Sequence, residues 1–366
     1  MTGNTLGWVI VAFVLYLLMM IAIGAFYAKG NNNSEDYFLG GRKLNGFVAA
    51  LSAQASDMSG CLLMGLPGAI YLTGVGGDGW IAIGLFIGTT LNWLFIATKL
   101  RRYTIRANNS VTLPTYFENR FHDEKKVLMT VSSITIVVFF LVYCASALSA
   151  GGQLFESVFG IDYHVALTIG ALVVLVYTFL GGFTAVCVTD FIQGMLMLVG
   201  ILAVPLFAYH FLTTGGTTLS AGLEASGADS ANFLNLMKNG DGSNNIVSVI
   251  SGLGWGLGYF GMPHILVRFM AVRDEKEMTK SKATAISWVA LSLGFAVFIG
   301  ILGRAYLPEL VNGNNEKVFI EMIKKVFTME MRAPFIAGLF LCGILAAIMS
   351  TADSQLLVSA SSVAED

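Results

Sequence analysis

Charged residues are scarce in this sequence. Asp, Glu, Lys and Arg make up 12% of the 366 residues, whereas hydrophobic residues make up 55%. A soluble domain has about 25% charged residues, so a chain this poor in charge is expected to be a polytopic membrane protein. The formal net charge of −2 argues against nucleic acid as a partner.

Cysteine and histidine are also rare, with four residues of each type. The cysteines lie inside apolar segments without the spacing of a zinc site or a disulfide framework, and the histidines form no H-x-x-H or HExxH pattern. No cleavable signal peptide is expected, because the first apolar run, 6–27, is too long and no basic region precedes it.

Long apolar runs are plentiful, and runs of about 20 residues indicate membrane helices. Nine such segments form one predicted transmembrane domain over 1–366: 6–27, 46–73, 79–98, 127–150, 163–182, 188–212, 246–269, 283–306 and 333–360. About 15 basic residues belong to one set of alternating connections and about six to the other. The positive-inside rule then predicts an amino terminus outside and a carboxyl terminus inside.

The second apolar segment contains AALSAQASDMSGCLLMGLPG, residues 49–68, whose middle is small, polar and acidic. A carboxylate at mid-membrane is costly, so Asp57 is expected to face protein, water or a cation. Ser, Asp and Gly are poor helix formers, which favours a helix that breaks at about 55–59 and frees backbone carbonyls. The alternative is a continuous helix whose serines bond to the preceding turn.

The seventh segment contains SGLGWGLGYFGMPHI, residues 251–265, with five glycines and a proline. Interrupted membrane segments in corresponding halves of a chain point to a transporter binding site. Trp255 and Tyr259 are one helical turn apart and could face the same cavity. The alternatives are interfacial anchoring for the two aromatics and close helix packing for the glycines.

The ninth segment contains LAAIMSTADSQLL, residues 345–357. Sodium is a hard cation that prefers oxygen ligands. The carbonyls near Ala55 and Met58 and the hydroxyls of Ser350 and Thr351 would supply them, although such hydroxyls often bond to their own backbone.

A second cation or proton position is also conceivable from the acids in these segments. It would combine Asp190 with two groups of the ninth segment, Asp353 and Ser354. The alternative for Asp190 is an ordinary carboxylate at a helix amino terminus, favoured by the helix dipole.

The runs FLGGRKLNGFVAALSAQASDMSGCLLMGLPGAIYLTG (38–74), GWGLGYFGMPHILVRFMA (254–271) and LAAIMSTADSQLLVSASSVAED (345–366) closely resemble the solute:sodium symporter family. The resemblance implies an all-α polytopic protein with a leucine-transporter-type core of two inverted five-helix repeats and one extra amino-terminal helix. It implies sodium-coupled import of L-proline across a bacterial cytoplasmic membrane, and no enzymatic activity. A second repeat beginning at the seventh segment has only three of its five helices in this chain, so the repeat is incomplete here.

The resemblance also implies roles for particular residues. Asp57 would be a functionally essential acid, and Arg42 would act in sodium coupling at the inner mouth. The sodium site would consist of backbone oxygens of Ala55, Met58 and Ala347 and the hydroxyls of Ser350 and Thr351. The solute would contact Ser59, Gly60, Tyr143, Trp255, Tyr259 and Pro263.

Other functions stay open at this point. Another solute, such as pantothenate, a sugar acid or another amino acid, would fit the same scaffold. A solute sensor would be expected to carry a signalling domain, and an intramembrane hydrolase would need a GxSxG or paired-aspartate motif. Neither feature is recognised in these residues.

Overall fold

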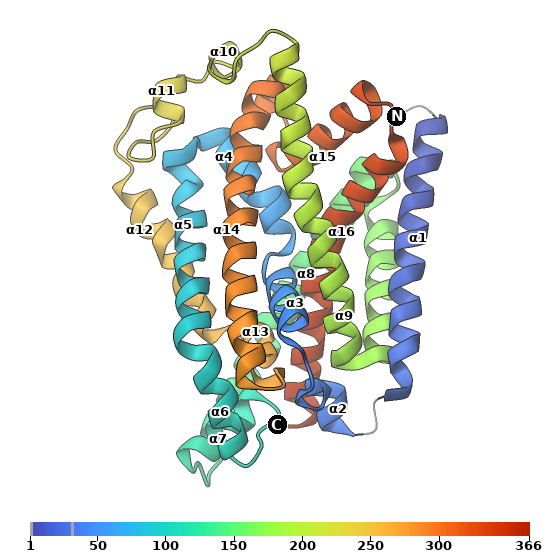
Figure 1. Ribbon diagram of the computed structural model, residues 1–366, viewed down its shortest axis with the longest axis vertical. Coiled ribbons are helices and arrows are strands. Elements are labelled where there is room, and N and C mark those ends of the chain that lie inside the picture. The colour runs from blue at the N-terminus through green and yellow to red at the C-terminus, as the bar shows by residue number, and fades with distance from the viewer. Residues whose placement is uncertain (1–2, 31–32) are drawn as a thin grey trace.

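The computed structural model describes residues 3–30 and 33–366, and all regular elements in these ranges are helical. Figure 1 shows the long helices side by side along the vertical axis. We call the end with α10, α11 and α15 the upper end, and the end with α2, α6 and α7 the lower end. The α-helices are α1 (Gly3–Tyr27), α2 (Ser34–Leu39), α3 (Gly46–Asp57), α4 (Leu66–Thr73), α5 (Val75–Leu91), α6 (Thr98–Arg106), α7 (Leu113–Phe121), α8 (Val127–Phe159), α9 (Tyr163–Thr214), α10 (Leu219–Ala225), α11 (Ser230–Phe233), α12 (Ile246–Gly254), α13 (Pro263–Ala271), α14 (Glu275–Tyr306), α15 (Val318–Ile323) and α16 (Pro334–Ala364).

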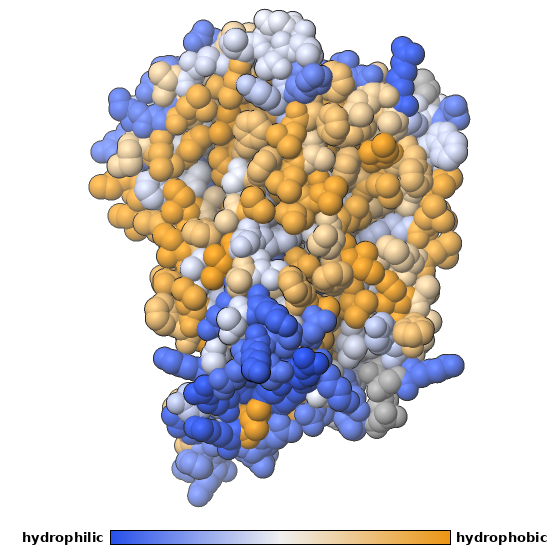
Figure 2. Space-filling model, in the orientation of Figure 1, coloured by the Kyte–Doolittle hydropathy of each residue, from blue (hydrophilic) through white to orange (hydrophobic). Residues whose placement is uncertain are grey.

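The helices are long and apolar enough to cross a bilayer. Among the described residues, six helices meet this condition, and two bent pairs raise the number to as many as eight. Figure 2 shows an apolar band across the middle of the molecule and a strongly hydrophilic lower end. This surface is the one expected of a multi-pass membrane protein, because lipid tails tolerate apolar side chains and exclude charged ones.

Two of the spans are broken, as the sequence predicted for 49–68 and 251–265. The segments Gly46–Asp57 and Cys61–Thr73 meet at 62°, and Ile246–Gly261 and Pro263–Ala271 meet at 47°. The first break begins at Met58, whose ψ of 7° departs from helical geometry, and a π-helical turn follows it. The second break is at Met262, which is extended because the following proline disfavours the helical conformation.

Helix α9 holds both the fifth and the sixth predicted segments. The chain reverses direction within it at Gly182, where φ is 59° and ψ is −160°, and the two arms run side by side in Figure 1. The predicted connection 183–187 is therefore wrong: one glycine makes the turn, and the helix resumes at Phe183. A Cβ atom at Gly182 would lie 2.9 Å from the Tyr37 ring, so both the positive φ and the close packing require glycine.

Close packing also explains part of the glycine-rich seventh segment. A Cβ atom at Gly252 would lie 2.6 Å from the Trp80 backbone, and one at Gly256 would lie 2.2 Å from the Gly84 carbonyl oxygen. Both glycines therefore let α5 approach the broken span, as small residues do between membrane helices. Gly254 and Gly258 have no atom within 4 Å of such a Cβ, so packing does not account for them.

A short helix, α15, covers part of the upper end. Five of the six residues of α15 are buried, because the segment is packed into the bundle rather than laid on its surface: Val318, Phe319, Ile320, Met322 and Ile323. Only Glu321 is not, so the segment is a buried cap.

Candidate functional site

The break between α3 and α4 faces two adjoining cavities. The small cavity, of about 80 Å³, is lined by Asp57 together with Tyr259, and the large cavity, of about 580 Å³, extends to Glu316 near the upper end. The residues that line both cavities come from three spans: Ser59, Cys61, Tyr143, Trp255 and Met262. The structure therefore brings together the broken ends of both interrupted spans and one face of α8.

Most of the predicted solute residues lie at these cavities. Ser59, Tyr143 and Trp255 line both, Tyr259 lines the small one, and Gly60 lines the large one. Trp255 is 54% exposed, whereas Tyr259 is 3% exposed, so the two aromatics differ in how far they reach the open space.

Pro263 is not at these cavities. It lines a different, nearly filled cavity of about 20 Å³ toward the lower end, which it shares with Thr112 and Arg268. Met262 lines the large cavity where Pro263 was expected. The backbone at Met262 is extended and leads the chain away from this cavity, so that Pro263 already begins α13. The structure therefore places Pro263 outside the two cavities, and its contact with the solute stays a prediction.

The predicted sodium ligands meet where α16 crosses the break in α3. The hydroxyl of Ser350 donates a hydrogen bond to the carbonyl oxygen of Ala55 (2.8 Å) and lies 3.3 Å from the carbonyl oxygen of Ala347. The hydroxyl of Thr351 donates to the same Ala347 oxygen (3.0 Å). Four of the five expected oxygens thus form one buried cluster from two helices, a donor set that suits a hard monovalent cation.

Met58, the fifth expected ligand, is bound differently. Its carbonyl oxygen accepts the backbone N–H of Leu62 at 3.2 Å, and its own N–H donates to Gln54. Only one residue between α3 and the following turn leaves helical geometry, so fewer carbonyls are freed than the sequence suggested. The Met58 carbonyl would reach a cation only by sharing or releasing its bond to Leu62.

Asp57 is a buried acid without an ion pair. Its side chain lies beside the Tyr259 hydroxyl, and its Oδ2 atom has no hydrogen-bond partner in the described residues. A buried carboxylate that lacks a partner is unfavourable, so this position favours a cation or a cationic group of a ligand. The cavity beside it supplies the room.

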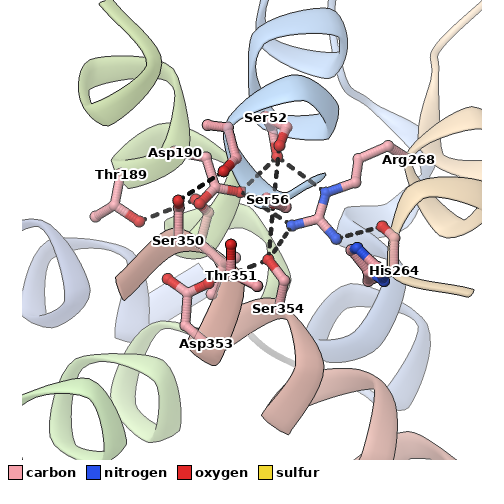
Figure 3. A network of polar contacts seen from close by, with 12 residues as sticks. Ser52, Ser56, Thr189, Asp190, His264, Arg268, Ser350, Thr351, Asp353 and Ser354 are labelled. Carbon is pink, nitrogen blue, oxygen red and sulfur yellow. Dashed lines mark hydrogen bonds and ion pairs between the residues drawn. The ribbon is translucent and has the colours of Figure 1, made fainter. Parts of the chain in front are cut away.

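The expected second cation position contains the guanidinium group of the protein's own Arg268 (Figure 3). Asp190 Oδ2 lies 2.9 Å from Arg268 Nη2, and it also accepts the hydroxyls of Ser52 (2.7 Å) and Ser56 (3.0 Å). The Ser354 hydroxyl lies 2.5 Å from Arg268 Nη2. Asp190 is fully buried and lies about two turns after the start of the second arm of α9, beyond the first turn in which the helix dipole favours a carboxylate.

Asp353 lies at the edge of this network. Its Oδ2 accepts the Tyr177 hydroxyl at 2.6 Å, and its Oδ1 accepts the Ser354 hydroxyl at 3.1 Å. The three predicted residues, Asp190, Asp353 and Ser354, thus belong to one network, in which Ser56 contacts both Asp190 and Ser354.

Arg42 holds the lower end of the molecule together. It is 8% exposed and adopts a positive φ of 54° at the end of the turn Gly40–Arg42. Its guanidinium donates to Asn109 Oδ1 (2.9 Å), Thr104 Oγ1 (3.3 Å) and the carbonyl oxygens of Met270 (2.9 Å) and Ser110 (2.8 Å). Burial, together with a smaller effect of the positive charge of Arg101, lowers the pKa of the Arg42 guanidinium to about 10, so Arg42 stays charged at neutral pH. Through these hydrogen bonds, this one side chain joins three segments that are distant in the sequence.

Sequence reasoning missed the role of Arg268. The sequence assigned Arg268 no function, whereas the structure shows it as a fully buried residue of α13. A signal was present, because Arg268 falls within the predicted segment 246–269 and an intramembrane cation needs an acid partner. Asp57, Asp190 and Asp353 were the candidate acids, and the structure shows that Asp190 is the partner.

Taken together, two broken spans, a buried oxygen cluster and a cavity beside both breaks define a secondary membrane transporter. A family model described as "Sodium:solute symporter family" matches residues 37–366. The chain belongs to this family, which confirms the resemblance seen in the sequence.

Curated relatives cover almost the whole chain. The chain is 45% identical over 363 residues to the sodium/proline symporter of Salmonella typhimurium and 44% identical over 363 residues to that of Escherichia coli, in each case 98% of this chain and 70% of the relative. It is 43% identical over 359 residues to the Staphylococcus aureus sodium/proline symporter, which is 97% of this chain and 67% of that relative.

A solved structure has the same fold. It is a Na⁺-coupled sialic acid symporter in a substrate-bound outward-open state, with a TM-score of 0.79 and 22% identity, and the match covers 97% of this chain and 73% of the other. The expected leucine-transporter-type architecture is therefore confirmed at the level of the fold.

Proposed function

We propose that this chain binds sodium and L-proline and carries both inward by alternating access across a bacterial cytoplasmic membrane. The observation that carries the proposal is the 43–45% identity, over 97–98% of the chain, to relatives named sodium/proline symporter. The 22% identity to the sialic acid symporter supports the fold and says nothing about the solute.

The oxygen cluster at Ala55, Ala347, Ser350 and Thr351 is the proposed sodium position. It joins α16 to the break in α3, so a bound cation would fix the position of the broken span. Ser59, which lines both cavities, lies only four residues after Ala55 in the sequence. Sodium would therefore order the solute side of the break, and linkage requires that the solute strengthens sodium binding equally, typically by about 1–3 kcal/mol.

The cavities beside this position suit a small zwitterion with an apolar body. Trp255 and Tyr259 offer aromatic faces for the proline ring. The Oδ2 atom of Asp57, which has no hydrogen-bond partner among the described residues, offers a partner for a cationic group. The solute carboxylate would meet backbone N–H groups at the break, where helix amino termini favour negative charge.

The conformation is closed at the lower end. The Arg42 network and the backbone pairing of Leu44 with Val272 hold the lower end of α3 against its neighbours, whereas the large cavity lies toward the upper end. Together with the basic residues of the lower connections, this supports a lower end that faces the cytoplasm and a conformation open to the outside. Inward transfer of one positive charge is favoured by about 2.3 kcal/mol per 100 mV.

The test is uptake of labelled L-proline into proteoliposomes that contain the purified chain. We expect uptake that is driven by an inward sodium gradient, that a potassium gradient of the same size fails to drive, and that excess unlabelled proline abolishes. A lack of sodium-driven uptake of labelled proline, together with sodium-driven uptake of labelled pantothenate or a labelled sugar acid, would assign a different solute. Equal uptake with sodium and potassium would contradict sodium coupling.

A further inference from the structure

The second broken span contains a backbone carbonyl group that has lost its α-helical partner. In an α-helix the carbonyl oxygen of Tyr259 would accept the backbone N–H of the residue four positions later. That residue is Pro263, which has no N–H group. Tyr259 is 3% exposed, and a buried carbonyl oxygen is unfavourable unless a donor is supplied.

A side chain of α5 supplies such a donor. Asn92 Nδ2 donates to the Tyr259 carbonyl oxygen at 2.9 Å, and Asn92 is 1% exposed. Helix α5 runs beside the broken span in Figure 1, and a Cβ atom at Gly88 would lie 2.2 Å from the Gly256 carbonyl oxygen. The backbones are therefore close here, and the amide of Asn92 is held against the 3₁₀-helical segment Trp255–Gly261.

The other end of Tyr259 also meets α5. The Tyr259 hydroxyl lies beside Asp57 and beside Thr89, which is 2% exposed. Tyr259 and Asp57 line the small cavity, whereas Asn92 and Thr89 are not among the described residues that line either cavity. The two polar residues of α5 are therefore placed to affect a bound solute through Tyr259 rather than by contact.

We propose that Asn92 is a positioning residue that holds Tyr259 beside Asp57 and thereby sets the affinity for the solute. This role rests on the proposed function, because a solute must occupy the small cavity for Tyr259 to affect its binding. Without the amide of Asn92, the segment around Tyr259 is free to shift at the break. The hydroxyl would then move away from Asp57, and the cavity would change shape.

Kinetics of sodium-driven uptake of labelled L-proline into proteoliposomes test this role. Asn92→Ala removes the donor without adding bulk. We expect its KM to rise by about tenfold, equivalent to about 1.4 kcal/mol, while Vmax per mole of protein stays unchanged. A lower Vmax or Tm with an unchanged KM would overturn the role, because Asn92 would then contribute to stability alone. If Asn92→Ala fails to fold, Asn92→Leu, which fills the space, replaces it in the same comparison.

Trp80→Phe is the matched control. Trp80 is also a residue of α5, and its Nε1 donates to the Leu236 carbonyl oxygen at 2.9 Å, so this variant likewise loses one side-chain donor to a distant carbonyl group. Trp80 is not among the described residues that line either cavity, so its KM for proline is expected to stay unchanged. Equal rises in KM for the Asn92 and Trp80 variants would overturn the positioning role.

A double-mutant cycle tests whether Asn92 acts through Tyr259. If it does, Asn92→Ala combined with Tyr259→Ala should have the same KM as Tyr259→Ala alone, because the positioned side chain is already absent. Rises in KM that multiply in the double variant would overturn the role, because they would show that the two residues act independently.

Failure of the proposed function gives a different result. A wild type that carries labelled pantothenate or a labelled sugar acid with sodium, and carries no proline, contradicts the proposed solute. The same variants are then compared with the solute that is carried. A KM that rises in Asn92→Ala and stays unchanged in Trp80→Phe would still support the positioning role.

Discussion

The hydroxyl of Ser350 lies 2.8 Å from the carbonyl oxygen of Ala55, although the two residues are 295 positions apart in the sequence. This hydrogen bond joins α16 to the end of α3 at the depth where α3 breaks. Both oxygens are fully buried, and a hydroxyl that bridges two helices is a better indication of a ligand site than one bonded only within its own turn.

We predict that Thr351→Ala weakens sodium binding. The variant loses one oxygen of the buried cluster and changes little else, since the hydroxyl contacts only the Ala347 carbonyl. A loss of about 1.4 kcal/mol is a tenfold change in a dissociation constant, so the half-activating sodium concentration for proline uptake should rise by about tenfold or more.

The control for this change is Ser361→Ala. Its hydroxyl also bonds within α16, to Val358, but lies toward the lower end of the helix. Equal sodium dependence in the Thr351 and Ser361 variants would exclude Thr351 as a ligand.

Asp57→Asn is expected to abolish sodium-dependent stabilisation without destabilising the protein in its absence. The Oδ2 atom of Asp57 is buried and unpaired, so removal of the charge relieves an unfavourable burial. Thermal unfolding in sodium and in choline measures both effects. Asp78→Asn, an acid whose partner is Thr73 near the upper end, serves as the control. A fall in the choline Tm of the Asp57 variant would show that the carboxylate is already paired favourably.

Trp255→Ala should raise the KM for proline and leave the amount of protein in the membrane unchanged. The ring lines both cavities and is half exposed to them, so it is positioned to cover a ligand rather than to fill the core. Phe260→Ala is the matched control, because Phe260 is an exposed aromatic of the same segment and lines neither cavity. Equal KM values for the two variants would assign Trp255 to packing or to lipid contact.

Gly84→Ala is expected to destabilise the protein. The added Cβ would lie 2.2 Å from the Gly252 carbonyl oxygen, so α5 and α12 must separate, and overpacking of this kind costs about 1–3 kcal/mol. Gly254→Ala meets no atom within 4 Å and should be neutral or stabilising, because alanine is the better helix former. Thermal unfolding distinguishes the two, and equal Tm values would rule out close packing at Gly84.

Arg42→Gln is expected to lower the stability of the protein by removing hydrogen bonds at the lower end. It leaves the carbonyl oxygens of Met270 and Ser110 without their partner, at a cost of about 1–3 kcal/mol for each buried group left unpaired. Thermal unfolding should show a lower Tm, and Lys43→Gln, the exposed neighbour, should leave it unchanged. If the two variants unfold at the same temperature, Arg42 does not fasten the lower end.

The positions of the membrane helices could be predicted from the sequence because a helix that crosses a bilayer needs about 20 predominantly apolar residues in a row. Each predicted segment lies on a helix or on a bent pair, and both interruptions fell where Ser, Asp, Gly and Pro gather. The sequence also placed a reversal between the fifth and sixth segments, but it did not show that a single glycine, Gly182, makes the turn. A window of apolar residues cannot distinguish a short connection from one glycine at positive φ, because both are apolar.

Only part of the site could be predicted, because a local pattern of residues shows which groups are present and does not show how they pack. Residues grouped by short motifs, such as Ser350 with Thr351, were found, and so was the pairing of Trp255 with Tyr259. Pro263 lies outside both cavities, because the direction in which a side chain points after a break depends on the tertiary packing of both halves.

The sequence by itself therefore determined the class of protein, the spans and the types of chemical group held in the membrane. The reason is that hydrocarbon disfavours polar groups that lack a partner, whatever the fold. Only the tertiary structure decided which groups meet. Arg268 and Asp190 are 78 positions apart, and their ion pair depends on how α13 packs against α9, which no local pattern of residues encodes.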